Sequence, residues 1–283
     1  MSAATPRSDD ALPPGDLRPW VDAQLRNWRI SEDIPQELSG ALIPHGSLTL
    51  CGRIAARTLH TLIIKRHPTT LLFLTTPHGG TGTQALISTE KKWSTPVGRV
   101  DADSLLVDSL LSLLAPALRR TPPHTPPSPA LSTVLPLVAA LAPGMRVLFI
   151  AIPDGVDAPV FGQRLGRLLS EQSKVSVVGV SDLTHYGEKH GFAPSGLGQS
   201  GADWLVENDA RLVTRVQNLA AESILAEARA QRSACCAPAI AAAVAVARAR
   251  DGWAGHLIGY TNSYLESGSG VFTDGIGYAG VVF

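Results

Sequence analysis

The sequence predicts one α/β domain with a largely parallel or mixed central sheet and helices on both faces. Short apolar runs of strand length, such as residues 70–75 and 175–180, alternate with longer segments whose leucines recur at helical spacing. Strands that alternate with helices form crossover units and hence a sheet of mainly parallel strands. Hydrophobic residues make up 45% of the 283 residues, which allows a sizeable core. We expect this domain over residues 36–283, after a partly disordered extension over residues 1–35.

The first half of the chain supplies several of the expected elements. A short helix within residues 19–38 carries two tryptophans, a strand at 40–44 precedes a helix near 52–64, and the strand at 70–75 leads into a glycine-rich loop at 79–82. A strand and turn at 95–100 come next. A helix then runs from Asp103 through Leu114, and Asp101 or Asp103 can cap it.

The second half continues the alternation. The proline-dense loop 121–129 cannot be helical. We expect it to be followed by a helix from Ala130, a strand at 146–152, a helix at 160–169 and the strand at 175–180. Two or three helices cover 202–250, and strands near 257–261 and 277–283 complete the domain.

Composition and charge narrow the classes of function. The net charge is formally zero, which argues against a nucleic-acid-binding protein. Residues 1–17 are polar and proline-rich, unlike a signal peptide, and the alanine-rich run 238–246 is too short to cross a membrane. The three cysteines form no C-x-x-C motif, and two of them are adjacent, which makes a disulfide framework improbable. We expect a cytoplasmic protein without a nucleic-acid or membrane partner; the oligomeric state is left open.

Candidate functional residues follow three of the expected strands. His45 and His78 each come after a proline at a strand end, and Asp182 and His185 lie just beyond the run 175–180. Ligands of open α/β sheets bind outside the carboxyl ends of the strands, so we expect these side chains at one edge. Imidazoles and a carboxylate gathered there are typical of a metal site or an acid–base site.

Three local motifs have alternative interpretations. Asp182 can orient His185 and fix its tautomer, or it can form a local Asx turn. Cys235 and Cys236 begin an expected helix, where a thiolate is favoured, but spacing alone favours two small buried apolar residues. The G-x-G-x-x-G run at 196–201 does not follow a strand, which argues against a dinucleotide site. No G-x-S-x-G motif is present, so a serine hydrolase lacks its nucleophile.

Taken together, these segments resemble the Memo-like family, also called AmmeMemoRadiSam system protein B, which is akin to the class III extradiol dioxygenases. The matching runs are Pro44-His45-Gly-Ser-Leu-Thr-Leu-Cys-Gly52, Thr75-Thr-Pro-His78, Thr95-Pro-Val-Gly98, Val180-Ser-Asp-Leu-Thr-His-Tyr-Gly187, Cys235-Cys236 and Ile276-Gly-Tyr-Ala279. The family's Glu-His-Ser-x-Glu motif falls on Ser128-Pro-Ala-Leu-Ser132, so its carboxylates and imidazole are missing here. The changed pocket lining indicates a divergent member with a different substrate or a changed role.

The resemblance implies a metal site formed by His45, His78 and Cys235. It implies Cys235 rather than Cys236 because Cys236 falls on the family's glycine. Neighbouring side chains at a helix start point about 100° apart, so we also expect only one thiol to face the pocket. The implied metal is a mononuclear transition metal, with iron(II) favoured and copper the other candidate.

The implied activity is that of a dioxygen-activating oxidoreductase acting on a small phenolic or catechol-like molecule. Asp182 and His185 would serve it as an acid–base pair. The alternative is a non-enzymatic metal-binding or adaptor protein that uses the same pocket.

Overall fold

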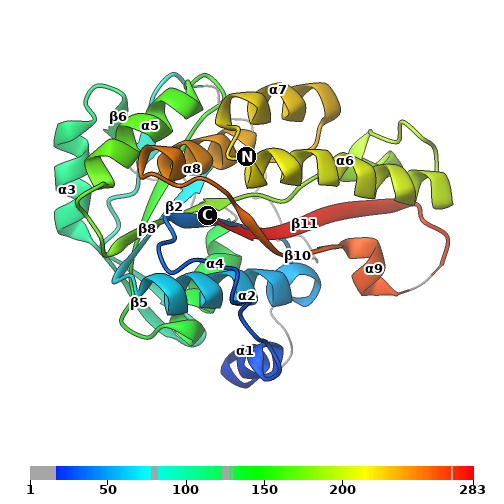
Figure 1. Ribbon diagram of the computed structural model, residues 1–283, viewed down its shortest axis with the longest axis horizontal. Helices are drawn as coiled ribbons and strands as arrows, with labels where there is room; N and C mark the ends of the chain where they lie inside the picture. Colours follow the sequence, from blue (N-terminus) through cyan, green and yellow to red (C-terminus); the bar gives the residue numbers. More distant parts are fainter. Residues whose placement is uncertain (1–16, 78–81, 123–127, 129, 269) are drawn as a thin grey trace.

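A mixed sheet forms the centre of the computed structural model, which describes residues 17–77, 82–122, 128, 130–268 and 270–283 (Figure 1). Its middle consists of parallel neighbours, in the order β1 (Gly40–Ile43), β8 (Val175–Val180), β2 (Thr70–Thr75) and β7 (Arg146–Ala151). Every residue of β1, β8 and β2 is buried, as expected for strands covered on both faces. The bounds of β2 and β8 are those that the apolar runs predicted.

The two edges of the sheet contain antiparallel strands. On one side, β11 (Asp274–Val282) pairs with β1, and both β10 (His256–Asn262) and β9 (His185–Gly187) pair with β11. On the other side, β3 (Ala85–Ile87) runs antiparallel to β7 and parallel to β6 (Leu118–Arg120). The hairpin of β4 (Lys92–Thr95) and β5 (Gly98–Ala102) joins β7 through β5. The sheet is therefore mixed, which the sequence had allowed.

Helices cover both faces, as predicted. Alternate side chains of β2 enter two cores: Leu71 and Phe73 face one side of the sheet, and Leu72 and Leu74 face the other. The first core contains α1 (Leu17–Leu25), α2 (Leu48–Arg66) and α4 (Ala130–Leu141). The second contains α3 (Ser104–Leu113), α5 (Ala158–Leu169) and α8 (Ala237–Ala249). Figure 1 shows α2 and α5 on opposite sides of the sheet.

The remaining helices lie around the C-terminal part of the sheet. They are the 3-10 helix η1 (Glu188–His190), α6 (Gln199–Gln217), α7 (Ala221–Gln231) and α9 (Ser263–Ser267). The helix α7 lies against α8, and α6 extends beside β11 (Figure 1). Among the residues that the structure describes, no helix has both the length and the apolar character needed to cross a membrane.

Local interactions define where the helices begin. Asp103, one of the two expected caps, is the one that caps α3, because its Oδ1 accepts a hydrogen bond from the Leu106 N–H at 3.3 Å. The helix α2 begins earlier than expected, because the Ser47 hydroxyl accepts from the Thr49 N–H. Close packing of α5 on α8 requires Gly162, since a Cβ atom there would lie 2.3 Å from the Ala242 carbonyl oxygen.

Candidate metal centre

The parallel pairing of β1 and β8 places His45 beside Asp182. Ile43 is paired with Val180, so both chains leave the sheet at the same carboxyl edge. The Asp182 Oδ1 atom accepts hydrogen bonds from the backbone N–H groups of His45 at 2.8 Å and Gly46 at 3.0 Å. The nearest approach of the two side chains is 3.8 Å, from His45 Nδ1 to Asp182 Oδ2. Asp182 thus fixes the turn that carries His45.

A hydroxyl group on α4 supports the same turn from the other side. Thr133 donates to the carbonyl oxygens of His45 and Gly46, at 3.0 and 3.1 Å. Together with Asp182, this hydroxyl pairs four backbone groups of a single turn. The His45 ring is therefore presented by a turn whose polar groups are paired with side chains of β8's loop and of α4.

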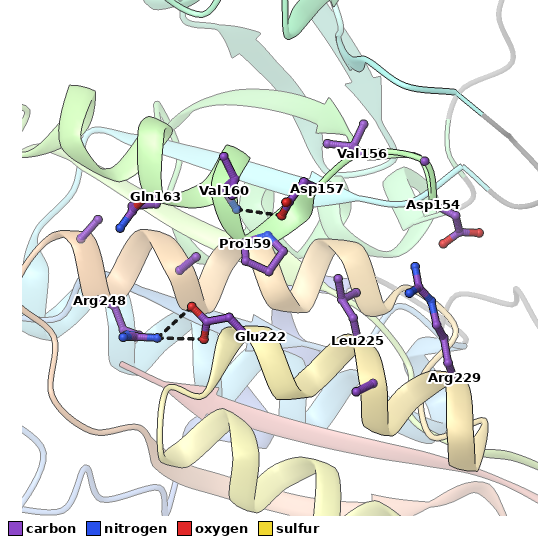
Figure 2. A pocket seen from close by; sticks show the side chains of 14 residues that line it. Asp154, Val156, Asp157, Pro159, Val160, Gln163, Glu222, Leu225, Arg229 and Arg248 are labelled. Atoms are coloured by element: carbon purple, nitrogen blue, oxygen red, sulfur yellow. Dashed lines mark hydrogen bonds and ion pairs between the residues drawn. The ribbon is translucent and has the colours of Figure 1, made fainter.

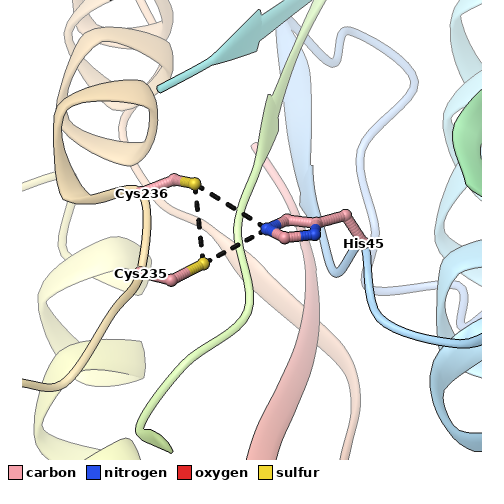
Figure 3. A group of neighbouring side chains, drawn as sticks. All are labelled: His45, Cys235 and Cys236. Carbon is pink, nitrogen blue, oxygen red and sulfur yellow. Dashed lines mark hydrogen bonds between the residues drawn. The ribbon is translucent and has the colours of Figure 1, made fainter. Parts of the chain in front are cut away.

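Two sulfur atoms face the His45 ring from the start of α8. His45 Nε2 lies 3.2 Å from Cys235 Sγ and 3.7 Å from Cys236 Sγ, and the two sulfurs are 3.5 Å apart (Figure 3). The expectation that only one thiol faces the pocket is therefore wrong. The two cysteines precede the helix, with Cys236 at its N-cap with φ −130° and ψ 50°, so the helical angle between neighbours does not apply.

A second group of donors shares Cys235 with the first. One donor atom from each of Asp182, His185 and Cys235 lies within 4.8 Å of the others, and the same holds for His45, Cys235 and Cys236. His185 begins β9 instead of lying in a turn, because residues 185–187 pair with β11. Its ring packs edge-on against His190, with ring centroids 5.1 Å apart.

Burial, charges and hydrogen bonds shift the pKa values of His45 and of the two cysteines. Burial lowers the pKa of His45, but the Asp182 carboxylate and the Cys235 sulfur outweigh it and raise this pKa to about 10. The hydrogen bond between the two sulfurs lowers the pKa of Cys235 well below its usual range, against the effect of burial. The same hydrogen bond, together with burial, raises the pKa of Cys236. The pKa values of the two cysteines are thus shifted in opposite directions.

The two other titratable groups of the site are also shifted. Burial raises the pKa of Asp182, although the His45 imidazole opposes that shift. Burial lowers the pKa of His185, but the hydrogen bond and charge of Cys235 raise it overall. Perturbed groups gathered at the strand ends are typical of functional sites.

The residues present fit a transition metal. The available donors are imidazole, thiolate and carboxylate, the ligand types that zinc, iron and copper use. Within the described ranges, the buried atoms His185 Nε2, Thr76 Oγ1 and Ser233 Oγ have no hydrogen-bond partner. A buried polar atom without a partner is costly, so a bound group near His185 would relieve that cost. His78, the third expected ligand, lies outside the described residues.

A buried carboxylate behind the site could not be identified from the sequence. Asp209 on α6 accepts from the Thr184 N–H at 3.0 Å and from the Tyr260 hydroxyl at 2.8 Å. Burial raises its pKa to about 7. Its position on the buried face of α6, between Leu205 and Leu212, was the one available signal.

A groove on the surface, between α5, α7 and α8, is separate from this site. It has a volume of about 720 Å³ (Figure 2). The Glu222–Arg248 ion pair at 2.9 Å crosses it, and none of its lining residues is an expected site residue. The groove is therefore not part of the candidate metal centre.

The protein is thus a mixed α/β protein with a group of imidazole and sulfur donors at its strand ends. Comparison with known proteins identifies its family. A family model described as Memo-like protein matches residues 17–282. The chain is similar to a MEMO1 family protein of Thermococcus onnurineus, with 25% identity over 265 residues that cover 88% of this chain and 87% of the relative. It is also similar to a MEMO1 family protein of Methanopyrus kandleri, with 26% identity over 282 residues that cover 95% and 94%. The chain belongs to the Memo-like family.

A solved structure shares the fold. An uncharacterized protein from Escherichia coli K12 superimposes with a TM-score of 0.54 over 87% of this chain and 99% of that chain. The sequence identity is 13%, so this likeness concerns the fold alone.

Proposed function

We propose that this protein is a metal-dependent oxidoreductase that activates dioxygen for reaction with a small phenolic or catechol-like molecule. The observation that carries the proposal is the 3.2 Å approach of His45 Nε2 to Cys235 Sγ, with His185 beside the same sulfur. His45 and Cys235 would bind a mononuclear transition metal together with His78, whose role rests on the sequence alone. A bound metal would supply coordination positions for dioxygen and for a substrate hydroxyl.

The side chains around the sulfur have distinct roles in this proposal. Asp182 is a positioning residue, because both of its strong hydrogen bonds go to the turn of His45. His185 has one ring nitrogen near Cys235, whereas its Nε2 has no partner among the described residues. That nitrogen can take a proton from a substrate hydroxyl and return it to product. This division refines the expected Asp182–His185 acid–base pair. His185 transfers the proton, and the charge of Asp182 raises the pKa of both His45 and His185.

The metal and the reaction can be tested separately. Metal analysis of freshly purified protein should show one equivalent of metal, with iron(II) or copper as the candidates. His45→Ala and Cys235→Ser should each lose it, whereas His60→Gln, at a histidine of α2 outside the site, should retain it. Unchanged metal content in both site variants would refute the metal centre. For the reaction, the metal-loaded protein should consume oxygen with simple phenols, and His185→Gln should slow this about 10²–10⁴-fold while keeping the metal.

A second candidate function is a non-enzymatic metal-binding protein. The observation that favours it is the second sulfur, Cys236 Sγ, at 3.7 Å from His45 Nε2. If this sulfur also bound the metal, it would close the ligand set, and closed sites are typical of bound metals without turnover. Full metal content without oxygen consumption for any phenol tested would support this candidate.

A further inference from the structure

The two consecutive cysteines at the start of α8 form a dithiol in which both sulfurs are held in contact. Their Sγ atoms are 3.5 Å apart. The loop before the helix is fixed by two hydrogen bonds: the Cys235 N–H donates to the Asp182 carbonyl oxygen at 3.2 Å, and the Cys236 N–H donates to the Ser181 hydroxyl at 3.1 Å. Cys235 is partly exposed, whereas Cys236 is buried. Of the two residues, Cys235 is therefore the one closer to solvent.

We propose that Cys235 and Cys236 are a thiol-oxidation site, at which a hydroperoxide converts the pair reversibly into a vicinal disulfide. The Cys235 sulfur attacks the peroxide, an S–O bond forms, the O–O bond breaks and water leaves. Cys236 then attacks the resulting sulfenic acid, the S–S bond forms, the S–O bond breaks and a second water leaves. Two thiols and one hydrogen peroxide give one disulfide and two waters, and the two electrons pass from the sulfurs to the peroxide.

The geometry supports both steps. His45 Nε2 lies 3.2 Å from Cys235 Sγ, within hydrogen-bonding distance of the sulfur that attacks the peroxide. A disulfide bond is about 2.05 Å long, so the sulfurs must approach each other by about 1.5 Å, which side-chain rotation can supply. Adjacent Cα atoms are about 3.8 Å apart, closer than the usual 4.4–6.8 Å of disulfides. The oxidised form is strained, and a thiol reductant should reverse it.

Oxidation would also control the metal. This consequence rests on the proposed metal centre, since a disulfide sulfur cannot serve as the thiolate ligand that Cys235 provides. Cys235 would then bind the metal only while the cysteine pair is reduced. A peroxide would release the metal, and reduction would restore the site.

Trypsin cleavage isolates the dithiol from the remaining cysteine. Cleavage after Arg232 and Arg248 leaves both sulfurs in residues 233–248, and Cys51 falls in residues 30–53. Metal-free full-length protein is treated with one equivalent of hydrogen peroxide, alkylated and digested. We expect peptide 233–248 to lose two hydrogen atoms and both alkylation sites, and dithiothreitol to restore them. Buried Cys51 is the internal reference and should remain alkylatable after denaturation.

Two variants define the order of the steps. Cys236→Ser should stop at the sulfenic acid of Cys235, trapped by dimedone, without losing two hydrogens. Cys235→Ser should leave Cys236 reduced. Oxidation of Cys51 as fast as the pair, or over-oxidation of Cys235 in the wild-type chain without a disulfide, would overturn the proposal.

Metal content separates this proposal from the proposed function. Iron(II) and copper(I) are offered to reduced, oxidised and re-reduced protein under argon. We expect the affinity for the metal to fall by more than about 10-fold on oxidation and to return on reduction. Mutation of a residue that only supports a metal ligand already costs about 10–100-fold in affinity, so the loss of a ligand should cost at least as much. If reduced protein binds no metal but forms the disulfide, the metal centre fails and the oxidation site stands. If metal binds and peroxide leaves the peptide reduced, the oxidation site fails.

Discussion

Replacement of Asp182 tests how the site is assembled, because one carboxylate oxygen pairs two backbone donors. Asp182→Ala leaves the N–H groups of His45 and Gly46 without their acceptor in a half-buried turn. Each unpaired donor costs about 1–3 kcal/mol, so we expect the free energy of unfolding to fall by about 2–6 kcal/mol. Asp182→Asn keeps an oxygen at that position and loses the charge assistance, for which we expect about 1–2 kcal/mol.

Urea unfolding of the metal-free protein, followed by circular dichroism and tryptophan fluorescence, measures both losses. Asp154→Ala, at an exposed aspartate after β7, is the matched control and should change stability by less than about 0.5 kcal/mol. Equal stability of the Ala and Asn variants of Asp182 would refute the reasoning. It would mean that the two N–H groups find other acceptors or that their pairing contributes nothing.

Three further predictions concern a buried carboxylate, the contact between α5 and α8, and the turn of His45. Because burial raises the pKa of Asp209 from 3.8 to about 7, the folded protein keeps a proton that the unfolded chain releases. The free energy of unfolding should therefore fall by up to about 4 kcal/mol as the pH rises through this window, and urea unfolding across it should show Asp209→Asn to have a flatter profile. Gly162→Ala should separate α5 from α8 at the Ala242 carbonyl and cost about 1–3 kcal/mol, measured as a lower Tm; an unchanged Tm contradicts this packing. Thr133→Val removes the hydroxyl that donates to the His45 carbonyl and should cost about 1 kcal/mol in urea unfolding, whereas Thr133→Ser should match the wild type.

The sequence predicts the centre of the sheet better than its edges. The strands β2 and β8 are uninterrupted apolar runs, because both faces of each are covered, and their ends are visible in the sequence. The strands β3, β6 and β9 have three residues each, too few to show a period, and they form because a distant partner is available. Their existence depends on tertiary pairing and not on local pattern.

The candidate site shows the same division. The sequence places His45 and Asp182 at strand ends, and the structure brings them to one edge through the pairing of β1 with β8. From the sequence, we expect Asp182 to pair with His185 because they are three residues apart. In the structure, the hydrogen bonds of the Asp182 carboxylate go to the turn of His45. The direction of Cys236 could not be predicted, since it depends on the N-cap backbone angles at the start of α8. The roles of these residues in metal binding stay predictions.

The positions of His45 and Cys235 in the chain also determine when the two side chains can meet during synthesis. His45 and Cys235 are 190 positions apart in the chain. Ribosomes add about 5–20 residues per second, so the imidazole is made about 10–40 seconds before its sulfur partner. A nascent chain that carries β1 and α2 has the histidine turn but neither the thiols nor the Asp182 carboxylate that pairs the turn's N–H groups. A site that needs both His45 and Cys235 can therefore assemble only in a polypeptide whose translation has passed the start of α8.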